Sequence, residues 1–157
     1  MSSSTNVLIR TARRADIPAM DSLIAEFANY MRELGDTSDL RFDADSLERD
    51  GFGEQPAFEG LVAEVSGIVV GYLLHHPGYD TDAACRLLFV ADLFVTQSAR
   101  GRGAGAALMR AARALATTRG AKQLVWTVYR RNVTARRFYE QLGARYADDL
   151  ALMSLEV

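Results

Sequence analysis

The stretch VTQSARGRGAGAALM, residues 95–109, decides the fold of this chain. It follows an apolar run, RLLFVADLFV, that predicts a strand ending at Val95, and it leads into an alanine-rich run that predicts a helix to about Arg119. A turn from a strand into a helix presents several backbone N–H groups without intrahelical partners, at the positive end of the helix dipole. The stretch therefore predicts an anion site.

Three glycines at alternate positions, Gly101, Gly103 and Gly105, remove the side chains that would keep a ligand away from those N–H groups. Arg100 and Arg102 can add charge-assisted hydrogen bonds to the same anion. A phosphate-bearing cofactor is the expected ligand, and the competing interpretation is a tight turn that binds nothing.

Three cofactors compete for this loop. A triphosphate loop requires Gly-Lys followed by Ser or Thr, and the chain has no such stretch. A dinucleotide site is compatible with Gly101-x-Gly103-x-x-Ala106, but the ribose-binding acid expected about twenty residues later is missing. Only 52 residues follow Gly105, too few for a second nucleotide-binding half. Coenzyme A, whose phosphates carry several negative charges, is the third candidate, and it suits residues 97–157, which carry eleven basic residues against four acids.

The length of 157 residues favours a single domain over residues 1–157. The composition, 49% apolar and 24% charged, is typical of a soluble globular protein. The lone cysteine, Cys85, suits a reducing compartment. Since the chain shows neither the apolar core of a signal peptide nor the roughly 20 apolar residues of a membrane helix, we expect a cytoplasmic protein without a membrane partner.

Hydrophobic periodicity predicts an α/β chain in the order β-α-α-β-β-β-α-β-α-β. Helices are expected in ADIPAMDSLIAEFANYMREL, DADSLERD, the run after the glycines and VTARRFYEQL, with Asp16 and Asn132 as caps of the first and last. GLVAEV and IVVGYLL predict a hairpin around Ser66-Gly67, followed by a loop over residues 76–86. The last two strands are expected in KQLVWTVY, ending at Tyr129, and in the tail RYADDLALMSLEV.

Two motifs, in order, resemble the GNAT superfamily of N-acetyltransferases. Arg100-x-x-Gly103-x-Gly105 matches that family's R/Q-x-x-G-x-G/A signature, and NxxAxxFYExLG at residues 132–143 matches its second conserved block at the expected distance. Within the family, the chain is most similar to the diamine (spermidine/spermine and thialysine) acetyltransferases. The similar stretches, which include LERDGFGEQP, ADLFV and NVTARRFYEQLGA, spread over residues 47–145.

The resemblance implies a mixed central sheet of about six to seven strands flanked by about four helices. Two neighbouring parallel strands, here those ending at Val95 and Tyr129, are expected to splay apart, so that the pantetheine arm of acetyl-CoA lies in the gap like an added strand. The resemblance implies three groups of cofactor-binding residues. Pantetheine and the thioester are expected to contact the backbone of Leu93, Phe94 and Val95. The pyrophosphate is expected to bind the N–H groups of Gly101, Arg102, Gly103, Ala104 and Gly105, with the side chains of Arg100 and Arg102, and the far side of the cofactor is expected to contact Asn132, Ala135 and Phe138.

The implied reaction is direct transfer of acetyl from sulfur to an amine that attacks as the neutral base. Tyr139 occupies the family position of the general acid, and a phenol can protonate the departing thiolate without being ionised itself at neutral pH. The base stays open, because Ala91 stands where the diamine enzymes carry a glutamate, and Asp92 is the nearest acid. Side chains alternate along a strand, so Asp92 is expected on the opposite face from Ala91. A water relay, or an amine that arrives neutral, is the alternative.

A small cationic amine is the expected acceptor, because eight acids lie between Glu33 and Glu54. Glu33, Asp36 and Asp92 are the candidate substrate-binding residues. The first two could replace an acid that the diamine enzymes carry at the position occupied here by Met31. The resemblance also implies a homodimer.

No metal is expected, because the only histidines, His75 and His76, are adjacent in a strand and point to opposite faces. No nucleic-acid partner is expected either, because the net charge is −2 and no binding motif of that type is present. Two other functions stay open. A catalytically silent acyl-CoA-binding sensor is disfavoured by Tyr139, and a small NADP-binding protein is disfavoured by the missing acid and the short tail.

Overall fold

The structure, a computed structural model, describes residues 6–157 as two compact units, one ending at Thr127 and one beginning at Val128. The helices and strands are β1 (Val7–Thr11), α1 (Ile17–Glu33), α2 (Ala44–Ser46), β2 (Glu59–Val65), β3 (Ile68–Asp80), β4 (Cys85–Val95), α3 (Ala104–Thr118), β5 (Ala121–Val125) and α4 (Val133–Gln141). The mixed α/β class and the four helices are as predicted. None of the helices among residues 6–157 is long and apolar enough to cross a membrane.

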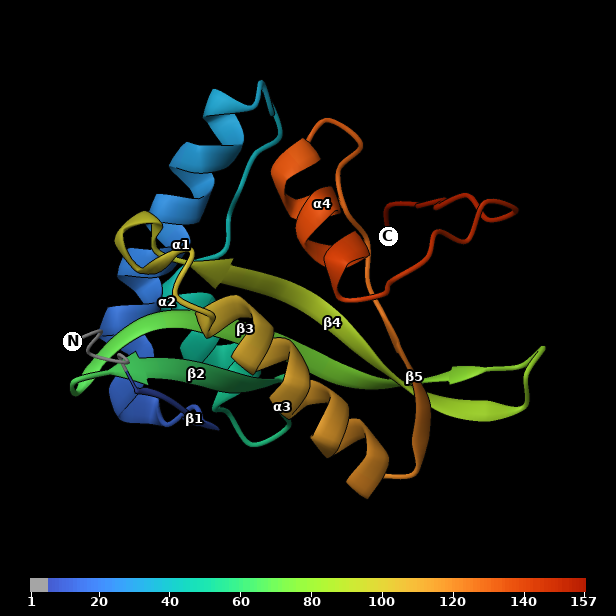
Figure 1. Cartoon of the computed structure of the whole chain (residues 1–157), viewed down its shortest axis with the longest axis horizontal. Coiled ribbons are helices and arrows are strands. Elements are labelled where there is room, and N and C mark those ends of the chain that lie inside the picture. Colours follow the sequence, from blue (N-terminus) through green and yellow to red (C-terminus); the bar gives the residue numbers. More distant parts are fainter. Residues whose placement is uncertain (1–5) are drawn as a thin grey trace. The chain divides into compact units, whose positions relative to one another are not determined.

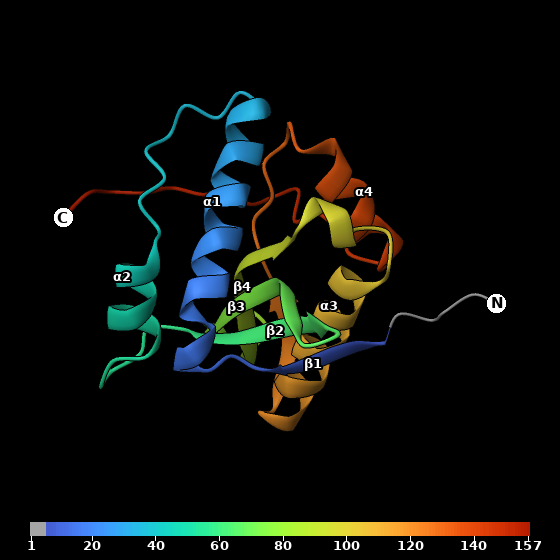
Figure 2. The same cartoon turned by 90° about the vertical axis from the view of Figure 1, so that its left-hand side faces the viewer.

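The first unit is built on one sheet of five strands in the order β1-β2-β3-β4-β5 (Figure 1). Neighbours from β1 to β4 are antiparallel, and only β4 and β5 are parallel. α1 and α2 cover one face of this sheet and α3 covers the other (Figure 2). A sheet with a single parallel pair does not have the strand arrangement of a dinucleotide-binding fold, which is mostly parallel.

The core of the α1 face joins the apolar stripe of the helix to the sheet. Its fully or nearly fully buried members are Ala12, Met20, Leu23, Ile24, Leu47, Val62, Tyr72, Leu74 and Phe94. Burying one such side chain contributes about 1.5–3 kcal/mol. On the other face, α3 buries Leu108, Ala112 and Ala116. Both faces of the middle strands are therefore covered, which explains why β4 reads as a nearly continuous apolar run.

The hairpin between β2 and β3 is confirmed, with Ser66 at φ 51° and Gly67 at φ 80°, both in the left-handed region that a two-residue turn requires. The loop predicted over residues 76–86 is wrong, because β3 continues to Asp80 and pairs with β4 as far as Cys85. Pro77 suggested a loop, yet β2 pairs with β3 only as far as His75, so Pro77 lies on a strand edge where no donor is needed.

The predicted count of six to seven strands is too high, because the described chain forms five. No strand forms in the tail, where Leu150, Leu152, Met153 and Leu155 are exposed. An alternating sequence becomes a strand only when its backbone groups pair with a neighbour. β5 also ends earlier than predicted, at Val125 rather than Tyr129, since its pairing with β4 stops at Phe89.

Asp16 links β1 to α1, although not by the capping bond that the sequence predicts. Its carboxylate accepts two hydrogen bonds from the Arg10 guanidinium, at 2.7 and 2.8 Å, and one from the Arg13 N–H at 2.7 Å. The hydrogen bonds from Arg10 hold the pKa of Asp16 below its ordinary value. Because the residue is buried, these charge-assisted bonds are screened little by water.

We expect Asp16→Ala to lower the free energy of unfolding by about 2 kcal/mol, the typical value of a charge-assisted hydrogen bond. A lowered folded-state pKa stabilises the fold above the unfolded value of 3.8, and the contribution disappears as pH falls through the folded pKa. Urea titrations should therefore separate wild type from variant at neutral pH and bring the two together only once the pH has fallen below the folded-state pKa of Asp16, which lies under 3.8.

The matched control is Asp39→Ala, which removes an exposed ion pair with Arg41. It should leave the unfolding free energy nearly unchanged at every pH, since exposed pairs contribute little. Equal losses in the two variants would contradict a special role for Asp16.

Candidate active site

One edge of β4 has no strand beside it over its second half. β3 pairs with β4 along the whole length of β4, from Cys85 to Val95. β5 pairs with β4 on the other edge only over Arg86–Phe89 (Figure 1). From Val90 to Val95 the backbone groups on that edge have no partner strand within the first unit. The parallel strands β4 and β5 thus stop pairing after Phe89, as the predicted splay requires.

A β-bulge at Ala91 lies where the two strands part. His75 pairs with Val90 and the preceding residue, Leu74, pairs with Asp92, so Ala91 is an extra residue in β4. A bulge bends its strand and increases the local twist, which turns β4 away from β5. The strict alternation that we assumed for this strand is interrupted at that point.

The strand alternation decides which backbone groups reach the open edge. The Thr96 N–H donates to the Val70 oxygen at 2.9 Å and therefore faces β3. Two residues earlier, Phe94 faces β3 as well, whereas Leu93 and Val95 face the open edge. Of the three residues expected to offer backbone groups to a cofactor, the structure thus brings two to the open edge, and Phe94 instead packs its ring in the α1 core.

The glycine loop follows β4 and starts α3. Gly101 has φ 72° and Gly103, the residue before α3, has φ 84°, so both adopt the left-handed conformation that favours glycine. A methyl group built on either would meet no atom within 4 Å, which means that the space above the loop is open. The N–H groups of the first turn, from Ala104 and Gly105 onward, point toward this space without intrahelical partners. The geometry fits a phosphate.

The two arginines of the loop differ. The Nε of Arg100 donates to the Val95 oxygen at 2.9 Å, and its guanidinium lies 4.9 Å from the ring centre of Tyr30 and 5.2 Å from that of Phe94. It therefore braces the base of the loop against α1. Arg102 is exposed as well, so both arginine side chains lie at the loop surface.

A second contact from α1, which the sequence analysis did not predict, holds the start of the loop. The Glu26 carboxylate accepts from the Thr96 hydroxyl at 2.8 and 3.0 Å and from the Gln97 N–H at 3.0 Å. No local spacing connects residues 70 positions apart, so only the folded chain shows this contact.

Asp92 is held by a partner that the sequence analysis missed. The Tyr72 hydroxyl donates to Oδ2 of Asp92 at 2.7 Å. Burial raises the pKa of Asp92, while the hydrogen bonds from Tyr72 and from the Leu93 N–H act in the opposite direction. The bond to Tyr72 places the Asp92 carboxylate on the α1 face of the sheet.

The candidate substrate acids lie at the end of α1. Glu33 is the last residue of the helix and is exposed, while Asp36 accepts a hydrogen bond from the Ser38 N–H at 2.9 Å. Met31 is only 1% exposed, so it belongs to the core and cannot contact a substrate. Tyr30, on the same turn, contacts Arg100, so the acids begin close to the loop after β4.

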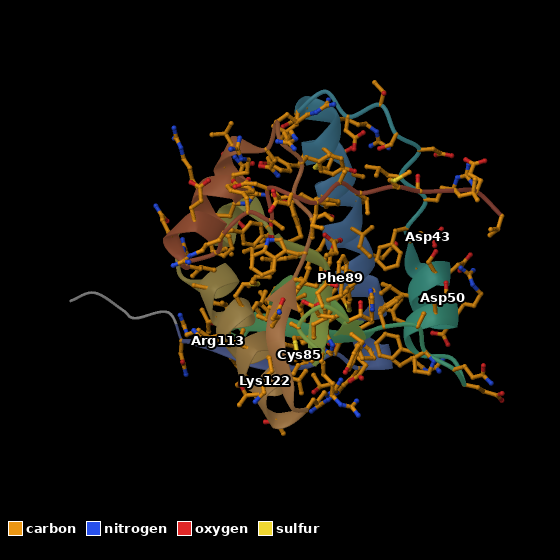
Figure 3. All side chains as sticks on the ribbon, turned by 90° about the vertical axis from the view of Figure 1, so that its right-hand side faces the viewer. Asp43, Asp50, Cys85, Phe89, Arg113 and Lys122 are labelled. Carbon is orange, nitrogen blue, oxygen red and sulfur yellow. The ribbon has the colours of Figure 1, made fainter. Side chains whose placement is uncertain are left out.

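Asp43 and Asp50 lie beside α2, while Arg113 on α3 and Lys122 on β5 lie on the opposite side (Figure 3). Among residues 6–157, no three His, Cys, Asp or Glu side chains are grouped so that they could hold a metal ion.

The second unit carries the other predicted site residues on α4. Asn132 caps this helix, because its Oδ1 accepts from the Ala135 N–H at 3.1 Å. Ala135, Phe138 and Tyr139 follow at spacings of three and four residues and therefore share one helix face. The rings of Phe138 and Tyr139 are 5.1 Å apart, and Tyr139 is half-buried. The cap and the stop at Gly143, with φ 86°, are as predicted.

Comparisons with known proteins agree with this geometry. The model of the acetyltransferase (GNAT) family matches residues 20–144. Thialysine N-epsilon-acetyltransferase of Bos taurus is 33% identical over 147 residues, which cover 88% of this chain and 84% of the relative. Spermidine/spermine N(1)-acetyltransferase-like protein 1 of Homo sapiens is 32% identical over 87% of this chain and 20% of its own length. An integron cassette protein of V. cholerae shares the fold, with a TM-score of 0.81, 24% identity and coverage of 96% and 93%.

Proposed function

Because the chain belongs to the acetyltransferase (GNAT) family, close to the diamine acetyltransferases, and is an N-acetyltransferase, we propose that it transfers acetyl from acetyl-CoA directly to the primary amine of a small cationic acceptor. The observation that carries the proposal is the open edge of β4 next to the glycine loop. In this proposal, the phosphates of coenzyme A lie on the N–H groups of residues 101–105, with Arg102 alongside. Arg100 stabilises the base of that loop.

The open edge suits the pantetheine arm. An extended chain with amide groups can add to an exposed strand edge through main-chain hydrogen bonds. Leu93 and Val95 have backbone groups on that edge, although the Val95 oxygen already accepts from Arg100. The Leu93 N–H also acts on the Asp92 carboxyl, so we assign the main backbone contacts to the Leu93 oxygen and the Val95 N–H. By the family resemblance, Asn132, Ala135 and Phe138 are further cofactor-binding residues in this proposal.

Acetyl-CoA supplies the acetyl group as a thioester, and transfer forms a C–N bond while the C–S bond breaks. A backbone N–H at the open edge stabilises the negative charge that develops on the carbonyl oxygen. The attacking neutral amine loses one proton to solvent water as the amide forms, and Tyr139 donates a proton to the departing sulfur. Coenzyme A therefore leaves as the thiol, and Tyr139 regains its proton from solvent. We assign Asp92 as the carboxylate that binds the ammonium group of the acceptor, either directly or through a water molecule.

The acceptor class rests on charge. Glu33 and Asp36 begin an acidic segment that reaches Glu54 and can attract an ammonium group. The relatives named for thialysine and for spermidine/spermine agree with a cationic amine. By the same resemblance, we propose a cytoplasmic homodimer.

We expect Gly103→Ala to weaken acetyl-CoA binding at least about tenfold, measured by calorimetry. Alanine at φ 84° costs about 1–2 kcal/mol in the left-handed conformation, and its methyl group enters the open space that we assign to the phosphates. Gly67→Ala is the matched control, because Gly67 also has positive φ and open space but lies in the β2–β3 turn. Equal affinities for the two variants would contradict the phosphate site.

We expect Tyr139→Phe to lower kcat about 100-fold or more, without changing the affinity for acetyl-CoA, since general acid catalysis contributes that much. Tyr129→Phe, at an exposed tyrosine of the same unit, should behave as wild type. Thiol release from acetyl-CoA with a panel of primary amines measures both variants.

The same panel tests the acceptor class. Diamines and lysine-like amines should react faster than neutral amines of the same length. Reaction with neutral or anionic amines alone would reject the cationic acceptor, and acetyl-CoA binding without any thiol release would favour the silent sensor module.

A further inference from the structure

The Tyr72–Asp92 pair is a buried polar contact inside an otherwise apolar face. The Tyr72 hydroxyl reaches Oδ2 of Asp92 at 2.7 Å, diagonally across the β3–β4 ladder, in which Tyr72 pairs with Phe94 and Leu74 pairs with Asp92. Tyr72 is completely buried, whereas Asp92 is only partly buried. The contact therefore joins a completely buried phenol to a carboxyl group that is itself buried enough for its pKa to be raised.

The surroundings of this pair leave the hydroxyl little choice of partner. The α1 residues in the same cluster, among them Met20, Leu23 and Ile24, are apolar. The groups that act on the Asp92 carboxyl, besides burial, are the Tyr72 hydroxyl and the Leu93 N–H. A buried hydroxyl without a partner is costly, so the pairing fixes the orientation of the carboxylate as much as that of the phenol.

Asp92 also lies directly after the bulge at Ala91, at the beginning of the open edge. This inference rests on the proposed function. We propose that Tyr72 is a positioning residue for the acceptor amine, because it holds the Asp92 carboxylate beside the open edge of β4. The hydroxyl occupies one oxygen, and an ionised carboxylate can accept about four hydrogen bonds, so acceptor capacity remains for an ammonium group.

Tyr72 is suited to this task because it stays neutral. Burial first, and then the negative charge of Asp92, raise the pKa of Tyr72 well above its ordinary value. The phenol is therefore a permanent donor, and only the carboxylate titrates. Removing the hydroxyl takes away a hydrogen bond that favours the ionised form, so the pKa of Asp92 should rise further.

The test is Tyr72→Phe, which keeps the ring and removes only the hydroxyl. We expect the pKa of Asp92, read from the 13C shift of its carboxyl group, to rise by about half to one unit. The lower limb of kcat/KM for the amine should move to higher pH by the same amount, which is a loss of about three- to tenfold on that limb. The KM for acetyl-CoA should stay unchanged.

Two further variants separate positioning from a structural effect. Tyr79→Phe alters an exposed tyrosine on the same strand and should leave both readouts as in wild type. In an Asp92→Asn background, Tyr72→Phe should change kcat/KM for the amine much less than it does in wild type, because Tyr72 acts through the carboxylate.

The outcomes separate this inference from the proposed function. An active wild type whose Tyr72→Phe variant keeps the wild-type carboxyl titration and pH profile would overturn the inference alone. Equal losses from Tyr72→Phe in both backgrounds would do the same, since they would indicate a packing role. A wild type that acetylates no amine would overturn the proposed function and this inference with it.

Discussion

The unpaired edge of β4 is the constraint on which the rest of the site depends. Backbone N–H and C=O groups are strong hydrogen-bonding groups that a protein rarely leaves unmatched in its interior. Here the bulge at Ala91 turns β4 away from β5, and the strand then continues for several residues with one edge unpaired. Such an edge is stable only if water or a ligand satisfies it. An extended molecule with amide groups, such as the pantetheine arm, is the partner that we propose.

Three side-chain contacts hold the second half of β4 and the beginning of the loop that follows it. Arg100 bonds to the Val95 oxygen, Glu26 binds Thr96 and Gln97, and Tyr72 holds Asp92 just after the bulge. The contact from Glu26 comes from α1, and Arg100 also lies over the Tyr30 ring of that helix, whose end begins the acidic segment. The helix that forms much of the core is therefore the same element that steadies the loop and leads to the acids proposed for the acceptor.

Short-range patterns in the sequence predicted the local structure well. The Ser66-Gly67 turn, the Asn132 cap and the glycine loop each depend on the conformational preferences of a few neighbouring residues, and the structure agrees with all three. Long-range pairing was not predictable in the same way. Pro77 suggested a loop because its edge position was unknown, Ala91 gave no sign of a bulge, and the alternating tail has no partner strand among the described residues. The contacts of Tyr72 and Glu26 join residues 20 or 70 positions apart, which no local pattern encodes.

Residue-resolved amide hydrogen exchange of β4, with and without acetyl-CoA, tests the central claim most directly. If the open edge binds the cofactor, the Val95 amide should exchange more slowly in its presence, because a bound partner protects it. The Phe94 amide, which already faces β3, should be unchanged. Saturating acetyl-CoA that leaves Val95 unprotected, while it protects amides elsewhere, would contradict the account.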